Sequence, residues 1–476
     1  MLHVPILRAG RSYRSLDLVR LPDVRTGRIV AEVSQANRGL IARDLLDAPR
    51  RARSLRSRQA SELAGVCAKA ASLFAGADLP VDEDTTHSPD DYLRHLSATT
   101  GMPLSLCRAN MEKIRFVLER MEEILAGWTR GLNPSILDAG WGLDGGRRVS
   151  YRACAEALGA VLPNNSPGVH SLWIPAFALK YPLVLKPGRQ EPWTPLRVVR
   201  ALMAAGAPDE AFSFYPCDHA GAVEILLRCG RSMLFGDAGT LGAWKEDPRV
   251  QLHGPGWSKV ILGEDEAPRW QDHLDLMVSS IADNGGRSCL NASGVWTPSH
   301  GLQIGRALAG RLAAIDARPL ADPQARIAAF PDPAQARRLS EHIDRLLQTP
   351  GARDLTAEVR GPQRIVEVDG CTFLRPTLIW CEDSEHPLAS CEYLFPYAAV
   401  VEVPRERMLQ RLGPTLVATA LTHDQEFRRE LLECGDIDRL NLGPIPTSRI
   451  SWDQPHEGNL FEHLYRQRAV QTDDAA

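Results

Sequence analysis

Lysine is scarce in this chain of 476 residues, where only six of the 55 lysine and arginine residues are lysine. An excess of positive charge is lacking too, because 59 acidic residues leave a formal net charge of -4 at pH 7. Non-specific binding to nucleic acid or to a membrane surface depends on a basic electrostatic field, which this composition does not supply. We therefore expect neither nucleic acid nor a membrane surface among the partners.

Long apolar runs and targeting signals are also missing. The stretch nearest to a membrane span is 172–185, which Pro175, Lys180 and Pro182 interrupt. The first 15 residues hold no apolar core preceded by basic residues, so they do not resemble a secretion signal. These absences predict a soluble, cytoplasmic protein.

Metal-binding and phosphate-binding motifs are equally scarce. The ten cysteines are scattered, with no CxxC pair and no Cys/His spacing typical of zinc, so we expect free thiols and no metal. The P-loop pattern GxxxxGK[ST] does not occur. GxGxxG occurs at 140–145, but inside the Gly- and Asp-rich stretch 137–150, which we interpret as a loop or hairpin and not as a phosphate site.

The residues that are present predict an α/β protein. Hydrophobic residues make up 44% of the chain, enough for a sizeable core. The helical spacing of apolar residues predicts a helix over 104–127, and a doubly wound parallel sheet begins near Val161. Such sheets bind nucleotides at the carboxyl ends of their strands. A second α/β block spans about 257–435, with helices over 272–283 and 301–315 and strands near 357–368.

One cysteine has a setting that suits catalysis. Cys289 ends the stretch Asn284-Gly-Gly-Arg-Ser-Cys289, directly after an amphipathic helix. A thiol in a glycine-flanked turn can be approached closely by substrate, and backbone amides there can stabilise a thiolate and an oxyanion. A single cysteine among ten is more often structural, so this motif needs support from elsewhere in the chain.

That support is a resemblance to the aldehyde dehydrogenase superfamily, whose nucleophile motif reads N-x-G-Q-x-C. In this chain Arg287 stands in place of the usual Gln. Further segments resemble family motifs in the family's order; they are Pro163–Pro167, Leu185–Pro187, Leu202–Ala211, Leu234–Asp237, Gly370–Thr377 and Glu392–Pro396. The resemblance implies a doubly wound Rossmann-type cofactor domain with the N-terminal region (1–255), an α/β catalytic domain (256–435) and a C-terminal arm used for oligomerisation (436–476).

The resemblance also implies residue roles. Cys289 would be the nucleophile and Asn165 the oxyanion-hole amide. Lys186 would contact the adenosine ribose of the cofactor, and Glu392 the nicotinamide ribose. The cofactor would be NAD or NADP, the substrate an aldehyde or acyl thioester, and the assembly a homodimer or homotetramer.

Two residues bear on the choice of cofactor. Arg189, just after the ribose-contacting lysine, would attract a 2′-phosphate, which slightly favours NADP unless its side chain points to solvent. Gly236 and Asp237 occupy the family's pyrophosphate-facing position. A carboxylate caps a helix well but repels a phosphate, so Asp237 either points away or marks a different mode of cofactor binding.

The largest departure lies at the family's general base, where His253 replaces a glutamate that activates water. Loss of that glutamate is typical of the CoA-acylating and acyl-CoA reductase branches, in which a thiol such as CoA takes the acyl group. We therefore expect an acyl-CoA reductase or acylating aldehyde dehydrogenase, which reduces an acyl-CoA to an aldehyde or catalyses the reverse, and for which CoA could be a co-substrate. Two alternatives remain: an acid-forming dehydrogenase with His253 as base, and a non-catalytic scaffold of the same fold. A cysteine hydrolase would need a histidine partner for Cys289, which the sequence does not place.

The C-terminal segment is rich in turn-forming and hydrogen-bonding residues. It contains Asn441–Thr447 and the stretch Trp452-Asp-Gln-Pro-His-Glu-Gly-Asn459. The segment could wall the substrate tunnel, but we expect an ordered arm that packs on a neighbouring subunit.

Overall fold

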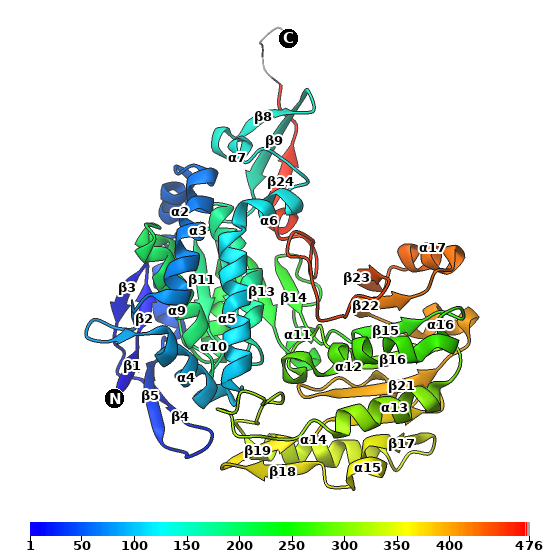
Figure 1. Ribbon diagram of the computed structural model, residues 1–476. Helices are drawn as coiled ribbons and strands as arrows, with labels where there is room; N and C mark the ends of the chain where they lie inside the picture. The colour runs from blue at the N-terminus through cyan, green and yellow to red at the C-terminus, as the bar shows by residue number, and fades with distance from the viewer. Residues whose placement is uncertain (472, 474–476) are drawn as a thin grey trace.

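Two seven-stranded sheets form the two halves of the protein in this computed structural model, which describes residues 1–471 and 473 (Figure 1). The first sheet runs β14 (Val250–His253), β13 (Gly230–Phe235), β10 (Ala157–Val161), β11 (Leu183–Lys186), β12 (Phe212–Phe214), β2 (Ile6–Arg8) and β3 (Arg11–Tyr13). The strands from β14 to β12 are parallel, and the β2–β3 hairpin adds an antiparallel edge. The predicted doubly wound parallel sheet is thus present.

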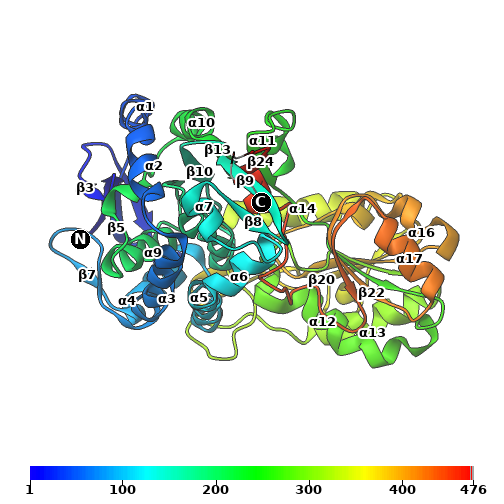
Figure 2. The same ribbon diagram turned by 90° about the horizontal axis from the view of Figure 1, so that it is seen from above.

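Helices cover both faces of this first sheet. The helices α1 (Arg38–Leu45) and α10 (His219–Arg228) lie on one face, and α3 (Ala60–Gly76), α5 (Leu104–Glu119) and α9 (Trp193–Ala204) on the other (Figure 2). Because both faces are covered, every residue of β10 is buried. The carboxyl ends of the parallel strands remain as the edge at which a ligand can bind.

The second sheet has its own core on each face. Its order is β17 (Ala352–Asp354), β20 (Thr377–Cys381), β21 (Tyr397–Glu402), β16 (Gly294–Thr297), β15 (Lys259–Leu262), β22 (Thr415–Leu421) and β23 (Ile437–Leu442), parallel except for β17. Successive residues alternate between the faces: Val260 packs with α12 (Leu274–Ala282) and α13 (Gly301–Ala313). Ile261 packs with α14 (Pro333–Leu346), α16 (Arg405–Leu412) and α17 (Gln425–Glu433).

Shorter elements complete the chain. The small sheets are β1 (Leu2–Val4) with β5 (Ile29–Ser34) and β4 (Leu18–Pro22), β6 (Leu79–Pro80) with β7 (Thr86–His87), β18 (Ile365–Val368) with β19 (Cys371–Leu374), and β24 (Tyr465–Arg468) with β9 (Arg147–Ala153) and β8 (Trp141–Asp144). The remaining helices are α2 (Ala48–Arg56), α4 (Pro89–Thr100), α6 (Met121–Trp128), α7 (Ser135–Ala139), α8 (Pro175–Ala178), α11 (Ala238–Gly242), α15 (Leu355–Arg360) and α18 (Leu460–Leu464). Among the described residues, none of these helices has the length and apolar content of a membrane span.

In three segments the structure differs from the local prediction or gives more detail than the prediction did. The single helix expected over 104–127 is divided into α5 and α6 at Arg120, whose φ of -100° and ψ of 25° are not helical. The stretch 137–150 contains the end of α7 and most of the β8–β9 hairpin, and its GxGxxG match covers strand β8 and the start of the hairpin turn, with no helix after it. Strands expected near 357–368 begin as α15 instead, because the Asp354 side chain caps that helix by accepting from the Ala357 N–H.

The C-terminal segment connects the two halves. Its first part, which we expected to belong to the arm, is β23, an edge strand of the second sheet. The chain after Leu442 then crosses back to the first half and ends as β24, paired antiparallel with β9 (red in Figure 1). This arm therefore runs from the edge of one sheet to the half that contains the other.

Candidate active site

The nucleophile motif forms a left-handed turn after α12. Asn284, Gly285 and Gly286, in the 3₁₀ turn η4 (Asp283–Gly286), have φ values of 53°, 68° and 68°. A Cβ on Gly286 would lie 2.3 Å from the backbone nitrogen of Pro396, so no larger residue fits there without a shift. This close approach sets the nucleophile loop against the segment Glu392–Pro396.

Side-chain amides tie this loop to the first half of the molecule. Asn110 on α5 donates from Nδ2 to Oδ1 of Asn284 at 2.7 Å, and Asn284 donates from Nδ2 to Oγ of Ser166 at 2.9 Å. The adjacent Asn165 donates from Nδ2 to the carbonyl of Arg287 at 3.0 Å. The structure thus places the Asn165 side chain in hydrogen-bond contact with the loop that carries Cys289.

The substituted residue Arg287 is buried. Its guanidinium donates to the carbonyls of Thr100, at 2.8 Å, and of Ala329, and it lies over the Phe330 ring at 5.8 Å. Burial lowers the pKa of Arg287 to about 10. In place of the family's Gln, this chain therefore uses an arginine that clamps backbone from both halves behind the nucleophile.

Cys289 lies against the segment that carries the substituted base. Its carbonyl accepts a hydrogen bond from Oγ of Ser258 at 2.8 Å. A Cβ on Gly256 would lie 2.0 Å from that same carbonyl oxygen. Burial raises the pKa of the Cys289 thiol well above its ordinary value, and the carboxylates of Glu457 and Glu392 add to this effect. The resting side chain is therefore a thiol that needs a base in order to react.

His253, at the end of β14, is held from both sides. Its Nδ1 pairs with Oε2 of Glu457 from the arm, and its ring stacks on Phe235 at 4.4 Å between centroids. Burial acts to raise the pKa of Glu457, but the charge and hydrogen bond of His253 outweigh it and hold that pKa below the ordinary value. The other nitrogen of His253, Nε2, is buried and has no hydrogen-bond partner among the described residues.

A second histidine of the arm reaches the nucleophile. Nε2 of His456 lies 4.0 Å from Sγ of Cys289, and its ring is nearly parallel to that of His253 with centroids 6.4 Å apart. Burial lowers the pKa of His456 to about 4, so its imidazole is neutral at pH 7. Sequence reasoning noticed the stretch 452–459 but did not select His456 or Glu457, because only the chain path brings them to Cys289.

The expected cofactor residues at the strand ends lie along the carboxyl edge of the first sheet. Lys186 ends β11 half-buried, and burial lowers its pKa. Neither its ammonium nor the exposed guanidinium of Arg189 has a hydrogen-bond or ion-pair partner among the described residues. Two unpaired cations at this edge fit the phosphates and ribose of a dinucleotide.

At the position expected to face the cofactor's pyrophosphate, the Asp237 side chain already occupies a backbone amide. Asp237 follows Gly236 at the end of β13 and caps α11, accepting from the Thr240 N–H at 2.8 Å. That backbone hydrogen bond is the main cause of the lowered pKa of Asp237. The carboxylate therefore uses one of the amides that could otherwise face a phosphate.

Glu392 faces the base segment. Its Oε1 accepts from the Gly256 N–H at 3.0 Å, and its Oε2 accepts from the Trp257 N–H. Burial raises the pKa of Glu392 to about 7 in spite of these two bonds. The structure therefore brings Cys289, Asn165, His253 and Glu392 to one junction.

Among the described residues, no cluster of three or more His, Cys, Asp and Glu side chains could hold a metal.

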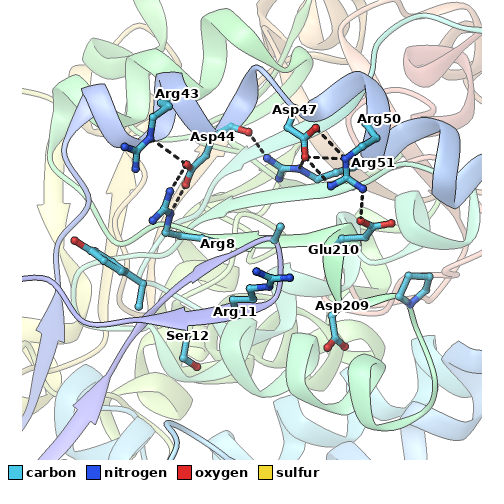
Figure 3. Close-up of a pocket in the computed structure, with 13 residues that line it drawn as sticks. Arg8, Arg11, Ser12, Arg43, Asp44, Asp47, Arg50, Arg51, Asp209 and Glu210 are labelled. Atoms are coloured by element: carbon cyan, nitrogen blue, oxygen red, sulfur yellow. Dashed lines mark hydrogen bonds and ion pairs between the residues drawn. The ribbon is translucent and has the colours of Figure 1, made fainter.

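A cavity lies apart from this junction. It has a volume of about 900 Å³ and is bordered by the β2–β3 hairpin, by α1 and α2, and by residues 208–210 (Figure 3). Arg8 pairs with Asp44 at 2.6 Å, and Arg50 bridges Asp47 and Glu210 at 2.7 and 2.8 Å. None of the predicted site residues lines this cavity, and several of its arginines and carboxylates are joined in internal ion pairs. In the arginine-rich stretch 50–58, four arginines have acidic partners; they are Arg50, Arg51, Arg56 and Arg58.

The chain belongs to the aldehyde dehydrogenase family, whose model matches residues 22–411. Solved structures with the same fold include gamma-glutamyl-gamma-aminobutyraldehyde dehydrogenase from Burkholderia cenocepacia J2315, with a TM-score of 0.80 and 16% identity over 98% of this chain and 96% of that one. An indole-3-acetaldehyde dehydrogenase complexed with NAD+ has a TM-score of 0.80 and 16% identity, covering 99% and 96%. An E. coli NADP-dependent enzyme has a TM-score of 0.77 and 17% identity, covering 98% and 97%.

A local sequence match points to the same family. Phenylacetaldehyde dehydrogenase from Pseudomonas fluorescens is 32% identical over 119 residues, which are 24% of this chain and 21% of that protein. Because the match spans so small a part of either chain, it adds no substrate. The family and the predicted aldehyde-dehydrogenase-like α/β fold are confirmed.

Proposed function

We propose that this protein is an NAD(P)-dependent aldehyde dehydrogenase that forms a thioester on Cys289 and releases a free acid, with His253 as the base that activates water. The observation that carries the proposal is the pairing of His253 with Glu457, which leaves Nε2 of His253 as the free nitrogen. A carboxylate that accepts from one imidazole nitrogen fixes the tautomer and leaves the other nitrogen as a proton acceptor. The pair thus supplies chemistry that the family's glutamate would otherwise supply.

The residues at the junction suit each step of this reaction. Sγ of Cys289 attacks the aldehyde carbon, and the amide of Asn165 with the Cys289 N–H stabilises the oxyanion. A bound nicotinamide would accept a hydride, which converts the adduct into a thioester. His253 then takes a proton from water as the water oxygen attacks the thioester carbon, and the Cys289 thiolate leaves and is reprotonated.

The cofactor would lie along the carboxyl edge of the first sheet. Lys186 and Arg189 would hold the adenosine end, and Arg189 favours a 2′-phosphate and hence NADP. Gly236 would allow close approach beside α11, while Asp237 reduces the room for negative charge there. Glu392 would reach the nicotinamide ribose only by giving up amide bonds to Gly256 and Trp257.

A second candidate is the reaction that the sequence favoured, reduction of an acyl-CoA to an aldehyde or its reverse. The absence of a carboxylate at position 253 supports it, because an unactivated water competes poorly with a thiolate for a thioester. A non-catalytic scaffold is less well supported, since it leaves unexplained why Cys289, Asn165 and two histidines converge.

The test is to follow nicotinamide absorbance with a panel of aldehydes and either oxidised cofactor, with and without free CoA, and to identify the product. The proposal expects reduced cofactor and free acid at a rate indifferent to CoA. Turnover that requires CoA and yields an acyl-CoA would replace it with the acylating reaction. A Cys289→Ser variant, which lacks the nucleophile, should abolish turnover in either case and serves as the control.

Assembly into a homodimer or homotetramer remains a prediction for this chain. The hairpin β8–β9 exposes Trp141 at 38% and Leu143 at 64%, and it forms one sheet with β24 of the arm. Exposed apolar side chains on such a sheet support its use as a subunit interface. Sedimentation velocity on the purified protein measures the assembly directly.

A further inference from the structure

The segment of the arm that crosses the active site is anchored on both sides of His456. The guanidinium of Arg439, on β23, donates to the carbonyls of Ser451, at 3.2 Å, and of Pro455. Gln251, on β14, donates from Nε2 to the carbonyl of Glu457. β23 and β14 are edge strands of the two large sheets. The backbone around His456 is therefore fixed by both halves of the molecule at once.

Further contacts keep this path from shifting. The indole Nε1 of Trp128 donates to the carbonyl of Trp452 at 2.9 Å, and Asn459 donates from Nδ2 to the carbonyl of Trp128 at 2.8 Å. A Cβ on Gly127 would lie 2.3 Å from the carbonyl oxygen of Asp453, so α6 approaches the arm closely. The position of His456 is thus determined by the fold and not by a free chain end.

A purely structural role explains His456 poorly. Its side chain is buried, and its Nδ1 has no hydrogen-bond partner among the described residues. A buried polar atom without a partner is destabilising, and an apolar side chain of similar size would avoid that cost. The polar contact that His456 does make is from Nε2 to Sγ of Cys289, at 4.0 Å. That separation is long for a hydrogen bond, even with sulfur, and such contacts often shorten when substrate binds.

We propose that His456 is the general base for the nucleophile, accepting the thiol proton of Cys289 as Sγ attacks. This step rests on the proposed function, because it activates the same cysteine, but it is distinct from the activation of water by His253. The Sγ–H bond breaks and the proton goes to Nε2 of His456. The Sγ–carbon bond forms, and the carbonyl π pair moves to the oxygen, which Asn165 stabilises. The imidazolium later returns its proton to the oxyanion or to solvent.

The charges around this pair suit a proton transfer at the moment of attack. Glu457 and Glu392 face Cys289 and keep the resting group protonated, so the thiolate is not exposed before substrate arrives. Glu457, His253 and Arg439 face His456. The carboxylate of Glu457 favours the imidazolium that forms in the step, whereas His253 and Arg439 oppose it. Burial keeps His456 neutral, and thus able to accept a proton, above about pH 4.

The test measures the thiol without cofactor or aldehyde. Alkylation of Cys289 by iodoacetamide is followed by peptide mass spectrometry as a function of pH for the wild type, His456→Gln and His463→Gln. The third protein is a matched control, since His463 is a half-buried histidine of the arm whose pKa burial also lowers to about 4, and Cys289 is not among its partners.

The wild-type rate at Cys289 should vary little between about pH 6 and 8, because the base is neutral throughout. In His456→Gln the rate at pH 7 should fall by about tenfold or more and rise about tenfold per pH unit, as expected for a thiol of raised pKa. His463→Gln should behave as the wild type. An unreactive wild-type Cys289, or equal profiles for the wild type and His456→Gln, would overturn the proposal.

Cofactor reduction with aldehyde, measured on the same three proteins, separates this proposal from the proposed function. If the wild type turns over while His456→Gln keeps the wild-type alkylation profile, the dehydrogenase stands and the role of His456 fails. If His456 governs alkylation but the wild type reduces no cofactor with any aldehyde, the Cys–His pair stands and the dehydrogenase fails. The Cys–His chemistry would then point to hydrolysis of an activated ester, for which p-nitrophenyl acetate is the probe.

Discussion

Two histidine–glutamate pairs in this molecule differ in what surrounds them. In the first half, Nε2 of His170 lies 2.5 Å from Oε2 of Glu191, and both side chains are only 1% exposed. Nδ1 of His170 accepts from the Trp173 indole at 3.1 Å, and Oε1 of Glu191 accepts from the Thr194 N–H at 2.8 Å. Every polar side-chain atom of this pair has a partner, which is typical of a structural pair.

The pair of His253 and Glu457 is incomplete by the same standard. Nε2 of His253 has no partner among the described residues, and the neighbouring His456 contacts the thiol of Cys289. The chemistry of the two pairs is the same, but only the second combines a free nitrogen with a nucleophile nearby. An unoccupied polar atom beside a thiol therefore indicates function more reliably than the presence of a His–Glu pair does.

The largest expected effect is on catalysis at the incomplete pair. His253→Gln keeps a side-chain amide that can bond Glu457 but removes the base near pH 7. We expect kcat for acid formation to fall by about 10² to 10⁴, the range typical of a general base. Steady-state rates at saturating aldehyde provide the measurement. His170→Gln is the matched control and should leave kcat within about twofold, because the side-chain hydrogen bonds of its pair go to Trp173 and Thr194 and not to Cys289, Asn165 or His253.

Breaking the fully hydrogen-bonded pair of His170 and Glu191 should lower stability more than it lowers the catalytic rate. The flexible amide of His170→Gln must donate to Glu191 and accept from the Trp173 indole without the fixed geometry of the ring, so at least one buried hydrogen bond is weakened. We expect the free energy of unfolding to fall by about 1–3 kcal/mol, measured by urea denaturation. His253→Gln should cost less, since Nε2 of His253 has no bond to lose. A greater loss of stability in His253→Gln would assign the second pair to structure.

A smaller effect, in the pH dependence of stability, separates the two carboxylates of the site. Glu392 has no histidine partner, and burial raises its pKa to about 7. Glu457 is paired with His253, which holds the pKa of Glu457 below its ordinary value. Because folding raises the pKa of Glu392, its protonated form stabilises the folded protein. That stabilisation is present below the unfolded pKa of about 4.5 and is lost as pH rises to about 7. Because folding lowers the pKa of Glu457, its ionised form stabilises the folded protein. That stabilisation is present above the unfolded pKa and is lost as pH falls through the pKa of the folded state.

Glu392→Gln should therefore reduce the decline in unfolding free energy between about pH 4.5 and 7, a change of at most about 1.4 kcal/mol for each pH unit of the pKa shift. Glu457→Gln should instead reduce the loss of stability on acidification below about pH 4.5. Urea unfolding at a series of pH values measures both. Parallel profiles for the two variants would contradict the difference in environment.

How much of this could be predicted from the sequence depends on whether a feature is local or long-range. A glycine-flanked turn at the nucleophile was predictable, and its left-handed conformation fits the tolerance of asparagine and glycine for positive φ. The parallel sheets were predictable from alternating helices and strands. The roles of Glu457 and His456 were not, because they depend on the path of an arm 167 residues beyond Cys289 in sequence. Arg287 was visible as a substitution, but its role as a clamp depends on the carbonyls of Thr100 and Ala329.

The most direct test of the central claim is the fate of the acyl group on Cys289 when His253 is lost. The wild type and His253→Gln are mixed with aldehyde and oxidised cofactor without CoA, and reduced cofactor and intact protein mass are followed together. The account predicts that the wild type turns over with no lasting adduct. His253→Gln should produce about one equivalent of reduced cofactor per site and then stall with an acyl group on Cys289. Continued wild-type turnover by His253→Gln, or a wild-type adduct that only CoA discharges, would contradict it.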